Sequence, residues 1–146
     1  MKITFKGDYA LKTILELARN YQAGLVTIPD LAKKTDMPRK FLEQIMLDLK
    51  KGGFIESKRG KEGGYQLSRA PEKITVGDVV RYIEGPLEPI ACVDTKYKGC
   101  KDIHDCVFRG LWVEVASRIS DVVDKTTFDM LLRQVKNRER SFDFSI

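Results

Sequence analysis

Apolar residues in the first twenty positions recur at intervals of three and four, as they do on one face of an α-helix. The repeat starts near Asp8 and includes Leu11, Ile14, Leu15 and Ala18. It ends at the stretch NYQAG, which is typical of a helix end. The pattern predicts a first amphipathic helix, and Asp8 is a good residue to cap its start.

Two further helix starts follow. In TIPDLAKKT, Thr27 and Asp30 have the spacing of a capping box, and Pro29 is tolerated in the first turn. In TDMPRKFLEQIMLDLKKGG, Asp36 is the candidate cap, and the two glycines after Lys51 end the helix. The residues expected to point inward are Phe41, Leu42, Ile45 and Leu49. Three short helices with a tight connection before the third predict a helix-turn-helix.

The third helix leaves a polar outer face near its start, formed by Arg39, Lys40, Glu43 and Gln44. Glutamine can bond adenine, glutamate can accept from cytosine, and the two cations can bind phosphate or guanine. An ordinary amphipathic helix with a polar face is the alternative. We expect the start of this helix to present these four residues to the major groove.

The segment GFIESKRGKEGGYQLSR predicts a β-hairpin, with strands over residues 54–57 and 65–68 and a tip rich in glycine and positive charge. A basic hairpin directly after three helices indicates a winged helix. Lys58, Arg59 and Lys61 are then placed to contact phosphates or the minor groove. The alternative, a surface hairpin made soluble by lysine, does not explain why the hairpin follows such a helix.

The second half predicts a short helix with a Thr75/Asp78 capping box that ends at Gly85, and PLEPIA then forms a linker. A long helix follows, and its apolar residues are spaced four, three, four and three apart. They are Phe108, Trp112, Val115, Ile119 and Val122. This stripe suits packing against the same helix of a second copy, although a monomeric core helix is the alternative. A final short helix should start near Thr126 or Thr127, with a frayed tail to Ile146.

The fold class predicted is therefore mainly α, a winged helix-turn-helix with a small β-hairpin wing and a long dimerisation helix. The expected divisions are a DNA-binding region over residues 1–70, a short helix and linker over 71–91, a cysteine loop over 92–106, and a dimerisation helix with a C-terminal helix or tail over 107–146.

Charge is unevenly divided along the 146 residues. Residues 1–70 carry 14 basic and 8 acidic side chains, a net +6, whereas residues 71–146 carry 12 and 13, a net −1. A positive first half favours a polyanion such as DNA, with a solvated lysine-rich surface as the alternative. We expect a cytoplasmic location, because the chain has neither a secretory h-region nor a membrane-spanning apolar run.

All three cysteines and the only histidine lie between Cys92 and Cys106. In the cytoplasm thiols stay reduced, so three clustered cysteines favour metal or redox chemistry over crosslinking. Gaps of seven and five residues are wider than in structural zinc sites and suit a loop that wraps an iron–sulfur cluster through Cys92, Cys100 and Cys106. Zinc, a redox thiol switch and inert cysteines are the alternatives. An enzyme is not expected, since no set of nucleophile, base and orienting residue can be assembled.

The chain resembles the IscR/NsrR/CymR family of winged-helix regulators, the Rrf superfamily, from residue 1 to about residue 137. The resemblance rests on MKITFKGDYALKTILELA, FLEQIMLDLKKGGFIESKRGKEGGYQLSR, ITVGDVVRYIEG and the three cysteines. It implies a homodimer on an inverted-repeat operator, with Glu43 and Gln44 in the major groove and Arg59 at the wing.

The fourth ligand of the predicted cluster separates the branches of this family. IscR-like members have a histidine three residues after the third cysteine, where this chain has Arg109. The cysteine spacing resembles NsrR-like nitric oxide sensors, in which an acidic residue from the partner subunit completes the site, and Asp8 matches it. His104 is the local alternative, and a water or small molecule is another.

The resulting prediction is a homodimeric repressor that binds double-stranded DNA under the control of an iron–sulfur cluster, with a four-iron cluster favoured over a two-iron one. The cluster would sense nitric oxide, redox or cluster status. The alternative is a CymR-like regulator controlled by a metabolic enzyme partner without a cluster.

Overall fold

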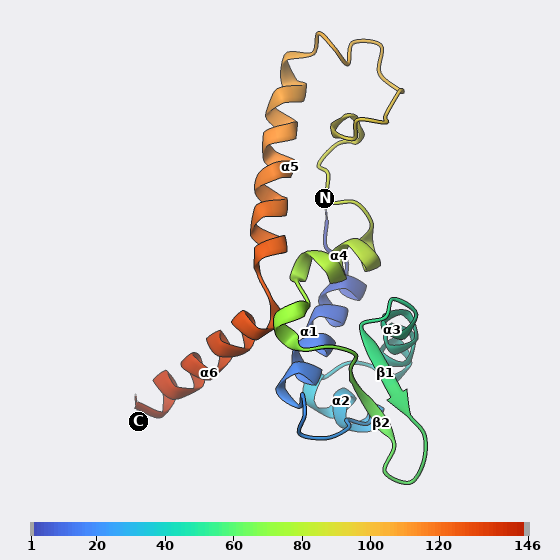
Figure 1. The fold of residues 1–146 in the computed structure, drawn as a ribbon, viewed down its shortest axis with the longest axis vertical. Helices are drawn as coiled ribbons and strands as arrows, with labels where there is room; N and C mark the ends of the chain where they lie inside the picture. The colour runs from blue at the N-terminus through green and yellow to red at the C-terminus, as the bar shows by residue number, and fades with distance from the viewer. Residues whose placement is uncertain (1, 145–146) are drawn as a thin grey trace.

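The computed structural model describes residues 2–144, which form six α-helices and one two-stranded sheet (Figure 1). The helices are α1 (Phe5–Arg19), α2 (Ile28–Thr35), α3 (Arg39–Lys51), α4 (Val76–Glu84), α5 (Val107–Lys125) and α6 (Phe128–Phe144). The strands are β1 (Ile55–Lys58) and β2 (Gly64–Leu67), and two 3₁₀ turns are η1 (Pro71–Lys73) and η2 (Ala91–Val93). The predicted class, mainly α with a hairpin wing, is confirmed.

Helix α1 starts earlier than predicted, and Asp8 does not cap it. The cap is Thr4, whose side chain accepts a hydrogen bond from the backbone N–H of Gly7 at 3.3 Å. Asp8 lies within the first turn instead, where a carboxylate favours the helix dipole. The prediction was wrong because the apolar repeat records only the buried face, and the first turn includes Phe5, which is 81% exposed.

The boundary between α2 and α3 also differs from the prediction. Thr27 caps α2 as expected, accepting from Asp30 N at 3.3 Å, but Asp36 ends α2 in a left-handed conformation with φ of 52°. Helix α3 starts at Arg39, and Pro38 occupies its cap position. Proline lacks an N–H and keeps the residue before it extended, so α3 begins only after Pro38.

One hydrophobic core lies where α1, α2, α3 and the hairpin meet. Its fully buried side chains include Ile14, Leu17, Leu31, Leu42, Ile45, Met46 and Leu49. Phe41, predicted to point inward, is 61% exposed. Since the buried face of α3 is set by the positions of Leu42, Ile45 and Leu49, Met46 shares that face and Phe41 turns outward.

Helix α4 has the predicted capping box. Asp78 N donates to Thr75 Oγ1, and Thr75 N donates to Asp78 Oδ2, both at 3.0 Å. The helix packs across α1 and ends at Glu84, before Gly85 with φ of 89°. The chain can therefore turn away from the core directly after α4.

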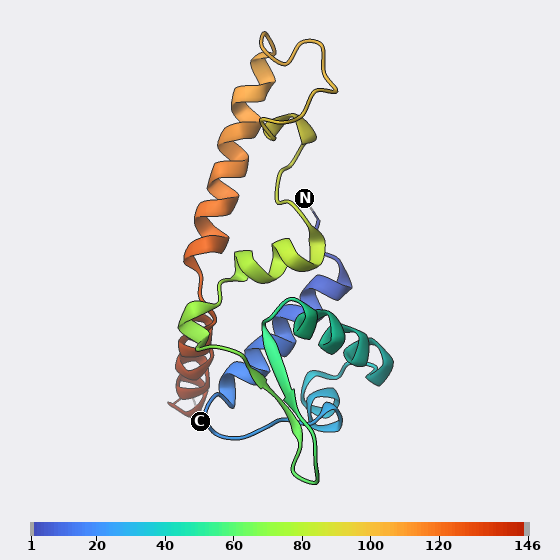
Figure 2. The same cartoon turned by 45° about the vertical axis from the view of Figure 1, so that its right-hand side comes forward.

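The junction between α5 and α6 is fastened to the core. Backbone hydrogen bonds join Val76 N to Thr126 O at 2.9 Å and Phe128 N to Ile74 O at 3.0 Å. Phe128 is fully buried. The long helix thus has a fixed base beside α4, whereas the rest of α5 and the loop before it extend away from the core (Figure 2).

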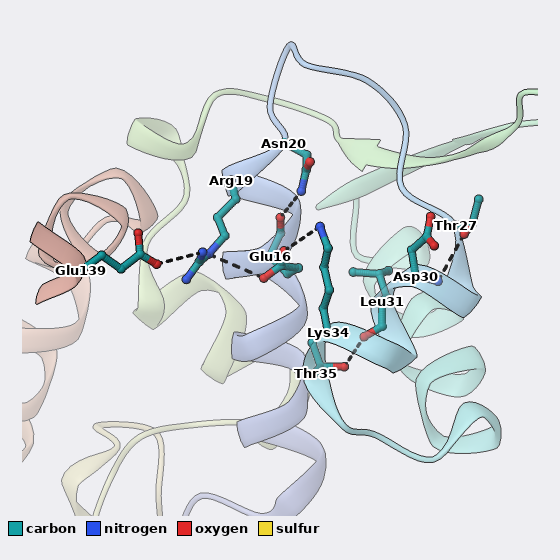
Figure 3. A network of polar contacts seen from close by, with 9 residues as sticks. All are labelled: Glu16, Arg19, Asn20, Thr27, Asp30, Leu31, Lys34, Thr35 and Glu139. Atoms are coloured by element: carbon teal, nitrogen blue, oxygen red, sulfur yellow. Dashed lines mark hydrogen bonds and ion pairs between the residues drawn. The ribbon is translucent and has the colours of Figure 1, made fainter. Parts of the chain in front are cut away.

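Helix α6 is longer than the short helix predicted, because the segment contains no glycine or proline to end it. It lies against α1, and Figure 3 shows Arg19 between two carboxylates. Arg19 Nη1 lies 3.3 Å from Glu139 Oε1, and its Nε lies 3.6 Å from Glu16 Oε2. Lys34 of α2 pairs with Glu16 at 3.3 Å. Of the predicted frayed tail, residues 145–146 lie outside the described residues.

Between residues 2 and 144, no helix combines the length and apolar character needed to cross a membrane.

Candidate nucleic-acid interface and cysteine arm

The four predicted base- and phosphate-contacting residues of α3 lie together on its exposed face. We call Arg39, Lys40, Glu43 and Gln44 the recognition row, and all four are exposed. They occupy the first half of α3, and the opposite face is buried in the core. The exposed placement that the sequence predicted is confirmed, while their contact with DNA stays a prediction.

Side chains of the recognition row pair along the helix. Arg39 Nε lies 3.6 Å from Glu43 Oε1, and Gln44 Nε2 donates to Asp48 Oδ1 at 3.3 Å. Such i,i+4 pairs restrict the rotamers of exposed side chains. The row therefore consists of partly ordered polar groups on the exposed face of α3.

Asp48 is a residue of this site that the sequence did not point to. Its side chain is only 18% exposed, and Lys6 Nζ from α1 lies 2.7 Å from its Oδ2, an atom shielded from solvent. The interaction with Lys6 lowers the pKa of the Asp48 carboxyl, although burial acts in the opposite direction. Asp48 is therefore ionised near neutral pH, and it can only accept hydrogen bonds.

The wing lies beside α3 in both views of the fold (Figures 1 and 2). The strands pair in antiparallel register from Ile55 opposite Leu67 to Lys58 opposite Gly64. Lys50 Nζ donates to Ser57 Oγ at 2.7 Å and so ties the end of α3 to the first strand. Helix α3 and the wing thus lie side by side and are joined by this contact.

A further backbone contact, which the sequence did not indicate, anchors the returning strand. Val26 N donates to Tyr65 O at 2.9 Å, and Tyr65 N donates to Val26 O at 2.8 Å. Val26 directly precedes the cap of α2. The segment before α2 therefore pairs with β2 through this isolated antiparallel bridge and joins the helix-turn-helix to the wing.

The wing tip carries Lys58, Arg59 and Lys61, and all three are exposed. None of these cations makes an ion pair with a residue in the described range 2–144. Gly60 has φ of 122°, and a Cβ on Gly63 would meet the carbonyl oxygen of Lys58. The glycines allow a tight turn, which leaves the three cations free for phosphate oxygens.

Residues 85–106, the cysteine arm, connect α4 to α5 (Figure 1). Cys92 is half-buried in η2, whereas Cys100 and Cys106 are exposed, and all three are free thiols. Across residues 2–144, no three Cys, His, Asp or Glu side chains are grouped so that they could hold a metal ion. The arm of a single chain therefore carries the predicted donors without bringing them into one coordination site.

Arg109, at the position of the IscR-like histidine, holds the arm against α5. Its Nε donates to the carbonyl oxygen of Cys92 at 3.0 Å. Arg109 also lines a hollow of about 450 Å³ together with Cys100 and His104. Cys106 stands at the cap of α5, but its side chain makes no capping hydrogen bond. The three thiols are chemically suited to a cluster, and their grouping requires the arm to close.

Asp8, the predicted fourth ligand, lies on α1 and not on the arm. Its Oδ2 accepts from Lys12 Nζ at 2.6 Å, an interaction that raises the pKa of Lys12. Asp8 borders a hollow of about 600 Å³ beside Ile3 and Phe5. This apolar surface is exposed near the start of α1. Within one chain Asp8 is not grouped with the cysteines.

Comparison with known proteins identifies the family. The Rrf2 model, described as an iron-dependent transcriptional regulator, matches residues 3–134. The chain belongs to the Rrf2 family. It is 30% identical to the HTH-type transcriptional regulator CymR of Bacillus subtilis over the full length of both chains. It is 32% identical to IscR of Aliivibrio salmonicida, covering 95% of this chain and 84% of that relative.

Solved structures of Rrf2 relatives share the fold. The structure of CymR, the global cysteine regulator of B. subtilis, has a TM-score of 0.78 and 30% identity, with 92% of this chain and 98% of that chain covered. T. potens IscR has a TM-score of 0.75 and 30% identity, with 92% and 88% covered. The chain is thus an Rrf2 winged-helix transcription regulator. Both kinds of relative match to a similar degree, so the mode of control has to be argued from this chain's own residues.

Proposed function

We propose that this chain forms a homodimeric repressor that binds an inverted-repeat operator, with its DNA binding controlled by an iron–sulfur cluster on the cysteine arm. The observation that carries the DNA-binding part is the shared exposed surface of the recognition row and the wing tip. This surface has seven polar side chains, of which all except Gln44 are charged and five are basic. Such a surface complements a groove and the phosphates beside it.

The two halves of this surface have different tasks. Lys58, Arg59 and Lys61 neutralise phosphates, so they supply affinity that depends on salt but little on sequence. Glu43 and Gln44 recognise base edges. Glu43 can accept a hydrogen bond from the cytosine amino group, and Gln44 can both donate to and accept from adenine. Arg39 and Lys40 at the start of α3 contact phosphate or guanine.

Dimer formation is supported by the apolar side chains that α5 leaves uncovered. Phe108 and Val122 from the predicted stripe are 62% and 66% exposed, and Leu111 is 51% exposed. Ala116 is the only α5 side chain within the described residues that is buried. A second α5 packed along this face would bury the stripe and place the two recognition helices on two half-sites.

The cluster proposal is supported by the chemistry of the arm. Cys92, Cys100 and Cys106 supply three soft thiolate ligands, and Asp8 of the partner subunit supplies the fourth. When bound, a four-iron cluster would supply a centre that reacts with nitric oxide or oxidants. Arg109 holds the Cys92 segment of the arm through the Cys92 carbonyl oxygen. Closure of the arm would exclude water from the thiols.

A second candidate function is a CymR-like regulator that carries no cluster and is controlled by a metabolic enzyme. Its support is the full-length similarity to B. subtilis CymR and the separation of the three thiols in a single chain. Iron binding distinguishes the two functions. If anaerobically purified protein supplied with iron and sulfide shows no bound iron and no visible-region absorption, the cluster proposal fails.

The fourth ligand can be tested on the same preparation. Asp8→Ala should retain a cluster on three cysteines but shift its spectrum and its response to nitric oxide, whereas His104→Ala should change little. A silent Asp8→Ala together with an altered cluster in His104→Ala would reject the cross-subunit ligand.

DNA recognition has its own test. Lys58→Ala or Lys61→Ala should weaken binding to all duplexes. Each should also reduce the magnitude of the slope of log K against log salt by about one, as expected for the loss of one phosphate contact. Gln44→Ala should instead change sequence preference. Equal loss of binding to selected and random duplexes in Gln44→Ala would remove its base-recognition role.

A further inference from the structure

Helix α3, which carries the recognition row, lies apart from the cysteine arm, with α4 and the start of α1 between them (Figures 1 and 2). Helix α1 packs against α3, which carries the row, and against α4, which leads into the arm. The first turns of α1 are therefore the direct connection between the two regions. The polar contacts of Lys6 and Thr4 there define how that connection is made.

Asp48 divides its two carboxylate oxygens between α3 and α1. Oδ1 accepts from Gln44 Nε2 at 3.3 Å, and Oδ2 faces Lys6 Nζ at 2.7 Å. Lys51 also lowers the pKa of Asp48 electrostatically, but its effect is smaller than that of the paired Lys6. Lys6 thus neutralises a partly buried anion that would otherwise be costly beside the recognition row.

The ionised carboxylate fixes the direction of the Gln44 amide. A carboxylate accepts but cannot donate, so only the NH₂ end of Gln44 can face it. The carbonyl oxygen and the second amide hydrogen are then left for DNA. These are the acceptor and donor with which glutamine bonds the N6 amino group and N7 of adenine.

The turn of α1 that carries Lys6 is bound to the end of α4, which leads into the arm. Glu84, the last residue of α4, accepts from Thr4 N at 2.9 Å and from Thr4 Oγ1 at 2.6 Å. A Cβ on Gly7 would meet Glu84 Oε1, so the absence of a side chain at Gly7 allows this approach. Glu84 therefore fixes the turn of α1 that carries Lys6.

We propose that Lys6 and Asp48 are positioning residues for operator selectivity, because together they set the orientation in which Gln44 presents its amide to a base pair. The proposal rests on the proposed base recognition by Gln44. It adds two residues, neither of which contacts DNA, that determine which base pair Gln44 prefers. Through Glu84 the same setting is tied to the base of the cysteine arm.

The test uses the full-length protein purified anaerobically and a duplex selected from a random pool by the unmodified protein. Binding is measured to that duplex and to each of its single base-pair variants. Lys6→Met and Asp48→Asn should each reduce, by about fivefold, the preference at the base pair where Gln44→Ala also loses preference. The slope of affinity against salt should not change, because Lys6 is assigned no phosphate contact.

Three controls separate positioning from a general effect. Lys2→Met removes an exposed lysine from the same end of the chain and should leave the preference intact, whereas Lys6→Arg keeps the ion pair and should restore it. The double variant Lys6→Met/Gln44→Ala should behave like Gln44→Ala alone, since both changes act on one interaction.

The outcomes distinguish this proposal from the function on which it rests. If Gln44→Ala loses preference at one base pair while Lys6→Met and Asp48→Asn retain it, the positioning role is wrong and base recognition stands. Uniform weakening at every base pair in Lys6→Met would also overturn the positioning role. If Gln44→Ala keeps the full preference, base recognition fails, and the positioning role fails with it.

Discussion

Two regions of the molecule differ in how fully they bury their own apolar side chains. One is the DNA-binding unit, formed by α1 to α4 with the hairpin, and the other is the cysteine arm with α5. The largest fully buried side chains lie in the first unit or its connections, with Phe128 added from the start of α6. Along α5 the large apolar side chains remain partly or largely exposed. The first unit closes its own core, whereas the second has apolar and thiol groups that a single chain leaves without partners.

The polar contacts show the same difference. In the first unit, Thr4, Thr27 and Thr75 cap three helices with side-chain hydrogen bonds, and Asp48 is paired. On the arm, Cys106 stands at the start of α5 without such a bond. We infer that the DNA-binding surface is preformed, and that the arm is the part of the chain that responds to a second copy and a ligand.

The largest difference between the two regions should appear in matched leucine truncations. Leu42 is fully buried, so Leu42→Ala should lower the free energy of unfolding by about 3 kcal/mol through lost burial and a cavity. Leu111 is 51% exposed, so Leu111→Ala should cost less than about 1 kcal/mol within the chain. Urea denaturation measures both values.

The same two variants also test the dimer. Leu111→Ala should weaken self-association in sedimentation experiments, because its side chain belongs to the uncovered face of α5. An unchanged dimer in Leu111→Ala, or equal destabilisation by the two truncations, would contradict the division between a closed core and an open helix.

A pair of glycine substitutions should give opposite signs of about 1 kcal/mol. Alanine is normally favoured over glycine inside a helix by about that amount. Gly110→Ala in α5 should therefore stabilise the chain, since nothing lies within 4 Å of the added Cβ. Gly7→Ala in α1 should destabilise it, because the added Cβ meets Glu84 Oε1. Thermal unfolding compares the two.

The sign of the Gly110→Ala effect also shows how closely a second copy approaches α5. Stabilisation would show that the partner helix does not approach this point closely. Destabilisation with weaker self-association would instead show that a second backbone packs against Gly110. Stabilisation by Gly7→Ala would contradict the close approach of Glu84 to the start of α1.

The smallest effect is a loss of folding stability at low pH, to which carboxylates of the DNA-binding unit and of the base of α5 both contribute. Contacts with Lys6, Thr4 and Arg81 lower the pKa values of Asp48, Glu84 and Asp124, respectively, from ordinary values of 3.8, 4.5 and 3.8. A lowered folded pKa contributes stability above the unfolded value, and that stability is lost as pH falls through the folded value. Stability should hold from pH 7 to about 5 and fall below about 4.5.

The contribution of Asp124 to this pH dependence can be measured separately, because Asp124 pairs with Arg81 where α4 contacts α5. Arg81 donates to both carboxylate oxygens, with the Nη2 to Oδ2 distance at 3.0 Å. Both side chains are more than one-third exposed, so Asp124→Asn should cost no more than about 1 kcal/mol at pH 7, and less at a pH below the lowered pKa of Asp124. An equal cost at both pH values would show that the effect is not electrostatic.

The DNA-binding unit was largely predictable from the sequence, because local rules set its elements. The capping pair of Thr75 and Asp78, the glycines after α3 and the glycine-rich hairpin tip each act over a few residues. The boundary errors arose where the deciding influence was not the apolar repeat. Pro38 displaced the start of α3, and Thr4 capped α1 ahead of the apolar repeat.

The long-range polar contacts could not be predicted in this way. Lys6 and Asp48 are 42 positions apart, and Thr4 and Glu84 are separated by 80. No periodicity connects such residues, because only the packing of α1 against α3 and α4 brings them together. The arrangement of the three cysteines was likewise beyond the sequence, since their spacing limits the reach of the arm but does not fix its closed form.

Hydrogen–deuterium exchange of the anaerobic protein, with and without iron and sulfide, tests whether the cysteine arm closes around a cluster. We expect reconstitution to protect residues 92–106 and the first turn of α1, whose Asp8 would bind the cluster of the other subunit, while the buried face of α3 exchanges as before. Protection should be lost again on addition of nitric oxide. Identical exchange of the arm in both preparations, although iron and sulfide are bound, would contradict an arm that closes around a cluster.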